Sequence, residues 1–151
     1  MKNEDESLYI VMPAYNEQDN IEAVVKSWYE VLAGKSDDSK LVVADSGSTD
    51  DTHRKLLALQ TDMPKLEILD DTDKQHGPKL LALYRYAITQ NAGWIFQTDS
   101  DGQTDPAEFT EFWNIRESMM QYSAIVYRVV TAGRGLSWNT WSVCCCDSTL
   151  E

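Results

Sequence analysis

Hydrophobic positions fall into short apolar runs that alternate with longer amphipathic segments along the chain. The short runs are too brief for helices and are typical of buried strands; they cover residues 8–12, 41–44, 66–69, 94–96 and 124–127. Between them apolar residues recur at helical spacing. The predicted helices cover residues 19–33, a segment from about residue 50 to the residues before Pro64, residues 78–90 and residues 106–120. We expect Pro13 to end the first strand, and Ser48 or Thr49 to be the N-cap of the second helix.

This alternation indicates β-α-β units, in which helices connect parallel strands through right-handed crossovers. It predicts an α/β fold of three α/β/α layers around a mainly parallel, Rossmann-like sheet. In such sheets ligands bind outside the carboxyl ends of the strands. The residues that follow each strand are therefore the first candidates for a functional site.

Polar residues directly follow three of the predicted strands. Glu17 comes after the first, Asp45 after the second, and Asp99 and Asp101 after the fourth. Residues two apart point to the same side of an extended chain, so Asp99 and Asp101 form a pair. Such a pair suits Mg²⁺ or Mn²⁺ that also contacts a diphosphate, because these ions prefer oxygen ligands. The alternative is an ordinary polar turn, since Asp, Ser and Gly are common in turns.

Composition narrows the functional classes. The 151 residues are typical of one domain, and 25 acidic against 13 basic residues give a net charge of −12, which argues against a nucleic-acid partner. No apolar run approaches the roughly 20 residues that span a bilayer, and the acidic start lacks a signal peptide. These features predict a cytoplasmic protein. The three cysteines, at 144–146, fit neither a disulfide framework nor a metal site.

Three motifs occur in order: YIVMPAYNE at residues 9–17, VVADSGSTDDT at 42–52 and QTDSDGQ at 97–103. With this order and spacing, residues 8–130 resemble the amino-terminal half of a family 2 glycosyltransferase with the GT-A, nucleotide-diphospho-sugar transferase fold. The resemblance implies metal-dependent transfer of a sugar, with inversion, from a nucleotide diphosphate donor to an acceptor hydroxyl or lipid phosphate. No Gly-x-Gly-x-x-Gly or Gly-Lys-Ser/Thr motif supports a dehydrogenase or a P-loop enzyme.

The resemblance implies a nucleobase side formed by Pro13, Ala14, Tyr15, Glu17 and Asp45. The Tyr15 ring would stack on the base, Glu17 would approach the ribose or base, and Asp45 would help to hold the base. Ser46 is a further candidate. It stands where family members often have a second aspartate, which leaves the preferred base open.

The resemblance also implies a diphosphate side. His76 to Lys79 match a segment that lines it, with Lys79 as a cation. Asp101 would be a direct ligand of Mg²⁺ or Mn²⁺, and Asp99 would face the ribose or sugar beside the metal. The plainer alternatives are a solvated Lys79 in a first helical turn and an ordinary loop histidine at His76.

The acceptor side is missing from the recognisable sequence. In the family the general base lies further on, and nothing after Tyr127 matches it. We interpret residues 1–130 as a partial donor-binding domain and 131–151 as an irregular tail, because the tail follows neither hydrophobic period. One hypothesis is a truncated or frame-altered end.

The expected partners follow from the family. They are a nucleotide-diphospho-sugar donor and a saccharide or polyprenyl-phosphate acceptor, the latter because DSDGQTDP at 99–106 is similar to members that glycosylate polyprenyl phosphate. We also expect peripheral association of the full-length protein with the inner face of the membrane, and a homo-oligomer formed through an exposed sheet edge. The alternatives are a non-catalytic nucleotide-sugar-binding or regulatory module, and a nucleotidyltransferase, which would need a glycine-rich basic loop near residues 15–17.

Overall fold

The computed structural model describes residues 7–120 and 142–145 and contains a five-stranded sheet in the order β3-β2-β1-β4-β5. The strands are β1 (Leu8–Ala14), β2 (Lys40–Asp45), β3 (Leu66–Leu69), β4 (Trp94–Gln97) and β5 (Ser142–Cys145). The helices are α1 (Ile21–Glu30), α2 (Thr52–Asp62), α3 (His76–Thr89) and α4 (Phe109–Met120), with a 3-10 turn at Pro106–Glu108.

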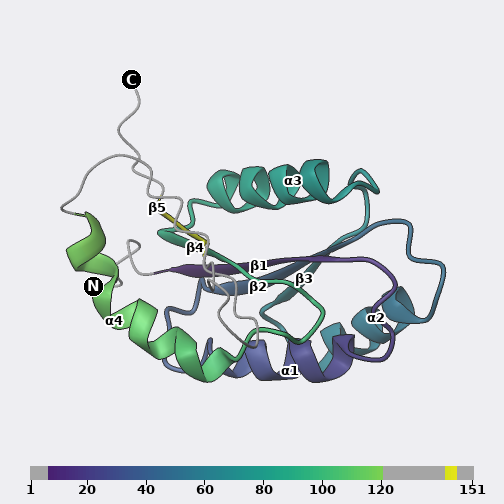
Figure 1. The fold of residues 1–151 in the computed structure, drawn as a ribbon, viewed down its shortest axis with the longest axis horizontal. Coiled ribbons are helices and arrows are strands. Elements are labelled where there is room, and N and C mark those ends of the chain that lie inside the picture. The colour runs from purple at the N-terminus through teal and green to yellow at the C-terminus, as the bar shows by residue number, and fades with distance from the viewer. Residues whose placement is uncertain (1–6, 121–141, 146–151) are drawn as a thin grey trace, which may run out of the picture.

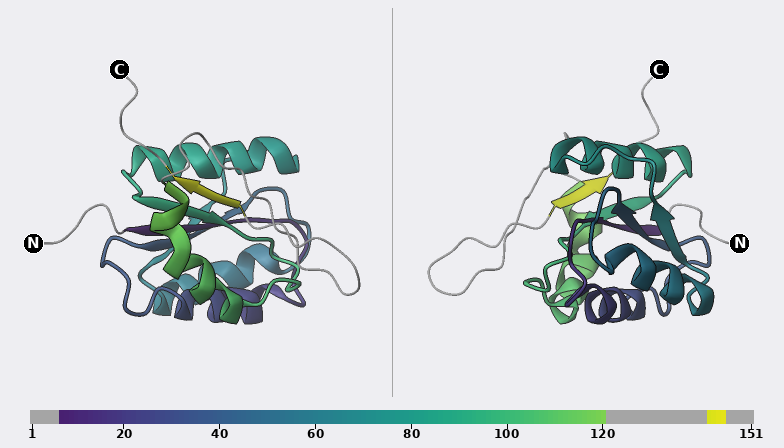
Figure 2. Two further views of the ribbon diagram at one scale, coloured as in Figure 1. Left: turned by 60° about the vertical axis from the view of Figure 1, so that its left-hand side comes forward. Right: turned by 90° about the vertical axis from the view of Figure 1, so that its right-hand side faces the viewer.

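Helices cover both faces of the sheet. α1 and α2 lie on one face and α3 on the other, as Figures 1 and 2 show. Strands β1 to β4 are parallel to one another, and β5 pairs antiparallel with β4. The predicted three-layer, mainly parallel α/β fold is confirmed. No helix in the described ranges is long and apolar enough to cross a membrane.

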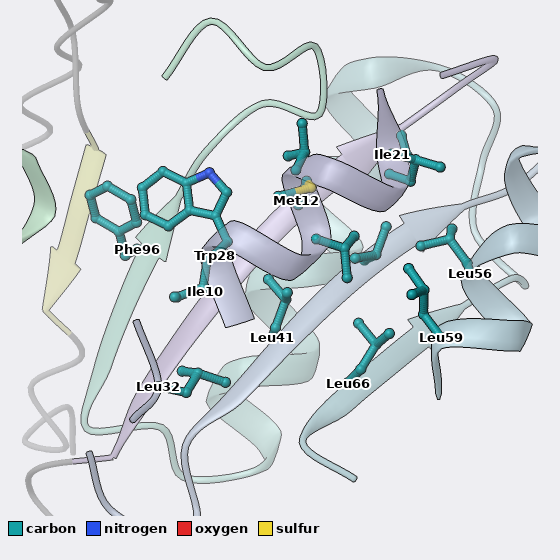
Figure 3. Packing of buried hydrophobic residues seen from close by; sticks show 14 of the residues in the cluster. Ile10, Met12, Ile21, Trp28, Leu32, Leu41, Leu56, Leu59, Leu66 and Phe96 are labelled. Atoms are coloured by element: carbon teal, nitrogen blue, oxygen red, sulfur yellow. The ribbon is translucent and has the colours of Figure 1, made fainter. Parts of the chain in front are cut away.

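The larger core lies between the sheet and α1, α2 and α4. Trp28 of α1 is fully buried, and the centre of its ring lies 5.4 Å from that of Phe96 (Figure 3). The ring centre of Phe109 lies 6.2 Å away. Alternate residues of β1, such as Ile10, enter this core, whereas Val11 faces the smaller core beneath α3. The two cores hold the central strands rigidly, so the loops at their carboxyl ends begin from fixed positions.

Strand β1 does not end at Pro13, as the sequence predicted, but continues to Ala14. Thr98 donates its backbone N–H to the carbonyl of Val11 at 3.1 Å, so the backbone of Val11 faces β4. Pro13, two residues on, faces the same side, but the pairing of β1 with β4 ends at Val11 and Gln97. The N–H that proline lacks would therefore have no ladder partner, and the strand continues through it.

Two helix starts also differ from the prediction. Helix α3 begins at His76, two residues before Pro78. The N-cap of α2 is Asp51, and the prediction of Ser48 or Thr49 was wrong. Both hydroxyl residues lie in the preceding turn, where they contact the loop after β1.

The end of the chain departs from the prediction in one respect. The expectation of an irregular segment from residue 131 onward was wrong for Ser142–Cys145, which pairs with β4. Cysteine behaves as a small hydrophobe, so residues 143–145 form a short apolar run of the kind that favours a strand, whereas the sequence analysis had considered the cysteines only for a disulfide or a metal site. The predicted strand at 124–127 lies outside the described residues.

Candidate functional site

A pocket with a volume of about 460 Å³ lies at the carboxyl edge of the sheet. Its lining consists of Pro13, Ala14, Tyr15, Glu17, Lys74, His76, Lys79, Asp99, Ser100 and Asp101. These residues come from the end of β1 and the loop after it, the loop before α3 and its first turn, and the loop after β4. Along the chain, β2 and β3 extend the sheet on one side of β1, whereas β4 lies on the other. The pocket therefore occupies the point where the strand order reverses, the usual binding crevice of open α/β sheets.

Most of the predicted site residues lie in this lining. The pocket brings together Pro13, Ala14, Tyr15, Glu17, Lys79, Asp99 and Asp101, and leaves out Asp45 and Ser46. It also includes His76, which could have been an ordinary loop histidine. The sequence reasoning missed Lys74 and Ser100. Ser100 could have been found from its place between the two aspartates, whereas no local pattern marks Lys74.

Asp45 makes contacts within the protein. The residue is only 2% exposed. Its carboxylate accepts a hydrogen bond from the Ser48 hydroxyl, and its Oδ2 lies 3.0 Å from Nδ1 of His53. Asp45 thus ties the end of β2 to the turn that follows and to the first turn of α2.

Ser46 is also buried, and it joins the loop after β2 to the loop after β3. Its hydroxyl shares a hydrogen bond with the hydroxyl of Thr72 and lies 3.2 Å from the carbonyl oxygen of Asp73. An aspartate at this position would bring a charge into contacts that suit a hydroxyl. The loop before α3 is therefore held close to the end of β2.

Lys79 is buried in the lining of the pocket, with 1% of its surface exposed, so the alternative of a solvated side chain was wrong. Its Nζ donates hydrogen bonds to the carbonyl oxygens of Ala14, at 2.8 Å, and Ser46, at 3.3 Å. It also lies 5.5 Å from the ring centroid of Tyr15. Burial lowers the pKa of Lys79, and the Asp45 carboxylate opposes this shift. The ammonium joins the ends of β1 and β2 beneath an aromatic ring.

Tyr15 presents a half-exposed ring at the pocket, with 51% of the residue accessible. The loop behind it is fixed by the second motif. Asn16 has a φ of 53°, a left-handed conformation that asparagine tolerates, and its N–H donates to the Ser48 hydroxyl at 3.0 Å. The N–H of Glu17 donates to Oγ1 of Thr52 at 2.8 Å. Ser48 and Thr52 therefore hold the loop that carries Tyr15.

The two aspartates lie in a short closed loop after β4. Thr98 and Thr104 share a hydrogen bond of 2.6 Å between their hydroxyls across the base of this loop. Gln103 donates its backbone N–H to Oδ1 of Asp101 at 3.0 Å, and Gly102, with a φ of +77°, provides the left-handed turn between them. This Asx-type turn orients the Asp101 carboxylate.

The carboxylates of Asp99 and Asp101 repel each other. Loss of solvation within the pocket raises the pKa of Asp99, Asp101 raises it further, and His76 acts in the opposite direction. A bound divalent cation would relieve this repulsion. Among the described residues no group of three or more His, Cys, Asp or Glu side chains could hold a metal alone. The pair nevertheless fits Mg²⁺ or Mn²⁺, which commonly use one or two carboxylates together with phosphate and water.

The fold and the pocket define an open α/β protein with an acidic binding crevice at the switch point of its sheet. A profile of the family described as glycosyl transferase family 2 matches residues 9–142. The chain therefore belongs to glycosyl transferase family 2. No curated protein sequence matches it.

Solved structures of glycosyltransferases share the fold. TarS from S. aureus is 18% identical with a TM-score of 0.60, over 87% of this chain and 38% of that one. Glucosyl-3-phosphoglycerate synthase from Mycobacterium tuberculosis, solved with UDP, is 24% identical with a TM-score of 0.54, over 76% and 40%. The mannosyltransferase PcManGT from Pyrobaculum calidifontis, solved with GDP-Man and Mn²⁺, is 24% identical with a TM-score of 0.55, over 64% and 28%.

These identities establish a common fold and nothing finer. The chain spans only 28% to 40% of the length of these three structures. The activity and substrates of a whole enzyme are therefore matters for a proposal.

Proposed function

We propose that this chain is the donor-binding part of a metal-dependent, inverting glycosyltransferase that uses a nucleotide diphosphate sugar. The observation that carries the proposal is the pocket itself, which unites Tyr15, Lys79 and the Asp99–Asp101 pair from three distant segments. Membership in glycosyl transferase family 2 supports sugar transfer as the reaction. Residues 1–130 would form the donor domain.

The pocket offers separate chemistry for the two ends of a donor. The exposed ring of Tyr15 would stack on the nucleobase, with Pro13 and Ala14 as neighbouring walls and Glu17 near the ribose or base. Asp45, which lies outside the lining, would support the base side through Ser48, which holds the loop of Tyr15. Ser46 would contribute through the loop that it anchors.

The acidic loop would act at the other end of the donor. Asp101, with Asp99 beside it, would hold Mg²⁺ or Mn²⁺, and Asp99 would also orient the ribose or sugar. When bound, the metal would neutralise the charge that develops on the departing diphosphate. A carboxylate must take the proton of the acceptor hydroxyl, and we assign that role to no residue of this chain.

The nature of the acceptor is the least constrained part of the proposal. A saccharide hydroxyl or a polyprenyl phosphate would fit hexosyl transfer in the synthesis of a cell-envelope polysaccharide. A lipid-linked acceptor would bring the full-length protein to the inner face of the membrane from the cytoplasm. Self-association through the sheet edge would be an additional property.

Thermal unfolding with nucleotides tests the donor site. The probes are UDP, GDP, UDP-glucose and GDP-mannose, each with and without Mn²⁺, because solved structures of the same fold contain UDP with Mn²⁺ and GDP-Man with Mn²⁺. A ligand at 100 times its Kd stabilises the native state by about 2.7 kcal/mol, which raises the melting temperature measurably. We expect one nucleotide to act, and only with Mn²⁺.

Two matched variants sharpen this test. Asp101→Asn should abolish the Mn²⁺-dependent rise, whereas Asp62→Asn, the same change at an exposed residue of α2, should preserve it. The proposal is wrong if no probe raises the melting temperature, or if both variants respond as the wild type does.

A non-catalytic nucleotide-sugar-binding or regulatory module is the second candidate. It is compatible with the pocket, because every role proposed for the lining residues concerns the donor. Such a module would bind the donor with Mn²⁺ in the same assay. It differs from an enzyme in that the full-length gene product would neither hydrolyse the donor nor transfer its sugar to any acceptor offered.

A further inference from the structure

Lys74 is a pocket residue to which neither the motifs nor the proposed function has given a role. It precedes α3 and lines the same cavity as the aspartate pair. Among the described residues its ammonium forms no hydrogen bond or ion pair, whereas the ammonium of Lys79 donates to two carbonyl oxygens. Of the two lysines in this lining, Lys74 is therefore the one whose ammonium is available to a ligand.

The position of Lys74 depends on Gly47. A Cβ atom placed on Gly47 would lie 2.9 Å from each of Cγ, Cδ and Cε of Lys74. Contacts this short show that the aliphatic part of the lysine lies flat across the glycine, with no room for a side chain between them. Long basic side chains commonly pack their stems on a surface in this way while the charged end stays free.

The loop that carries Lys74 is anchored on both sides. Ser46 contacts the hydroxyl of Thr72 and the carbonyl oxygen of Asp73. On the other side, Gln75 donates its N–H to Oδ1 of Asp73 at 2.9 Å. The backbone next to Lys74 is thus held by Ser46 of the loop after β2. The anchored loop and the contact with Gly47 thus fix the stem of a lysine that lines the pocket.

The charges of the pocket indicate which chemical group of the donor Lys74 would contact. Glu17, Asp99 and Asp101 contribute three carboxylates, and a metal bound at the pair would leave the phosphate groups of a donor in need of further cations. We propose that Lys74 is a further donor-binding residue that contacts a phosphate oxygen of the nucleoside diphosphate, and that Gly47 is the positioning residue that lets it do so. This inference rests on the proposed function and adds a residue to it.

The test compares nucleoside diphosphates with nucleosides. Affinities for UDP and GDP are measured by calorimetry in the presence of Mn²⁺, and those for uridine and guanosine by ligand-observed NMR. For Lys74→Met we expect about tenfold weaker binding of the preferred diphosphate, the size of one partly exposed charge contact, with the nucleoside unchanged. Lys74→Arg should retain most of the affinity because it keeps the charge.

Gly47→Ala supplies an independent variant with a matched control. It should reproduce the selective loss of diphosphate affinity, because the added methyl group displaces the lysine stem. Gly34→Ala introduces a side chain at a similar positive φ, +76° against +82°, but meets no atom within 4 Å. It therefore reproduces the backbone strain alone and should leave the affinity unchanged.

The outcomes separate the two levels of the argument. If the wild type binds neither diphosphate with Mn²⁺, the proposed function fails and this inference fails with it. If the wild type binds one of them and Lys74→Met binds it equally well, or loses nucleoside and diphosphate affinity in the same ratio, only the role of Lys74 is refuted. Equal behaviour of Gly47→Ala and Gly34→Ala would refute the role of Gly47.

Discussion

Replacement of Lys79 by methionine tests how the carboxyl edge of the sheet is held together. The side chain is 1% exposed, and its Nζ donates to the carbonyl oxygens of Ala14 and Ser46, at 2.8 and 3.3 Å. Methionine is similar in length and apolar, so it fills the space but donates no hydrogen bond. The change therefore removes the polar link between β1 and β2 with little change in packing.

The size of the effect follows from two opposing terms. Each hydrogen bond from a charged donor contributes roughly 1.5 to 3 kcal/mol, and the longer one less. Against this, the buried ammonium has lost hydration, which is why the pKa of Lys79 is lowered. We expect Lys79→Met to reduce the free energy of unfolding by about 2 kcal/mol. Lys79→Ala should cost roughly 2 kcal/mol more, because three buried methylene groups are lost as well.

Urea unfolding followed by circular dichroism measures these differences. Lys26→Met, at an exposed position of α1, is the matched control and should change stability by less than about 0.5 kcal/mol. If Lys79→Met costs no more than Lys26→Met, the ammonium does not join the two strands, and the reasoning from its two hydrogen bonds is refuted.

Two further predictions concern the core and the acidic loop. Trp28→Ala should lower the free energy of unfolding by about 3 to 5 kcal/mol in urea, since the fully buried ring leaves a cavity; a loss below about 1 kcal/mol would contradict the packing. The raised pKa of Asp99 means that the unfolded state ionises first, so its contribution to stability is present at low pH and is lost as pH rises above the ordinary aspartate value of about 4. Mn²⁺ binds the ionised pair, so the Mn²⁺-dependent rise in melting temperature should increase as pH rises above about 4. This rise should be absent in Asp99→Asn, and a rise independent of pH in the wild type would contradict the reasoning.

The fold and the acidic part of the site follow from local patterns. The run at residues 94–96 is apolar and too short for a helix, and Asp99 and Asp101 follow it at once. Local sequence determines that this segment forms a strand. The β-α-β pattern around it determines the direction of the strand, and therefore the edge of the sheet at which its carboxyl end lies. The sequence could therefore place this pair at the carboxyl edge, where the structure has it.

The remaining contacts of the pocket depend on residues far apart in the sequence. Lys79 stands in the first turn of a helix, where a lysine is usually solvated, and is buried because the carbonyl oxygen of Ala14, 65 residues earlier, accepts its hydrogen bond. The stem of Lys74 follows Gly47 in the same way. No periodicity in or before α3 carries this information, because Ala14 belongs to β1 and Gly47 to the loop after β2.

The second motif, at residues 42–52, shows that a residue of a family motif need not line the binding pocket. Asp45 and Ser46 were expected beside the ligand, yet neither lines the pocket. Asp45 bonds to Ser48, and Ser48 in turn accepts the N–H of Asn16, next to Tyr15. Ser46 anchors the loop that carries Lys74. In this structure the motif shapes both walls of the pocket through their supporting loops, so a substitution within it should be judged by how it moves Tyr15 and Lys74.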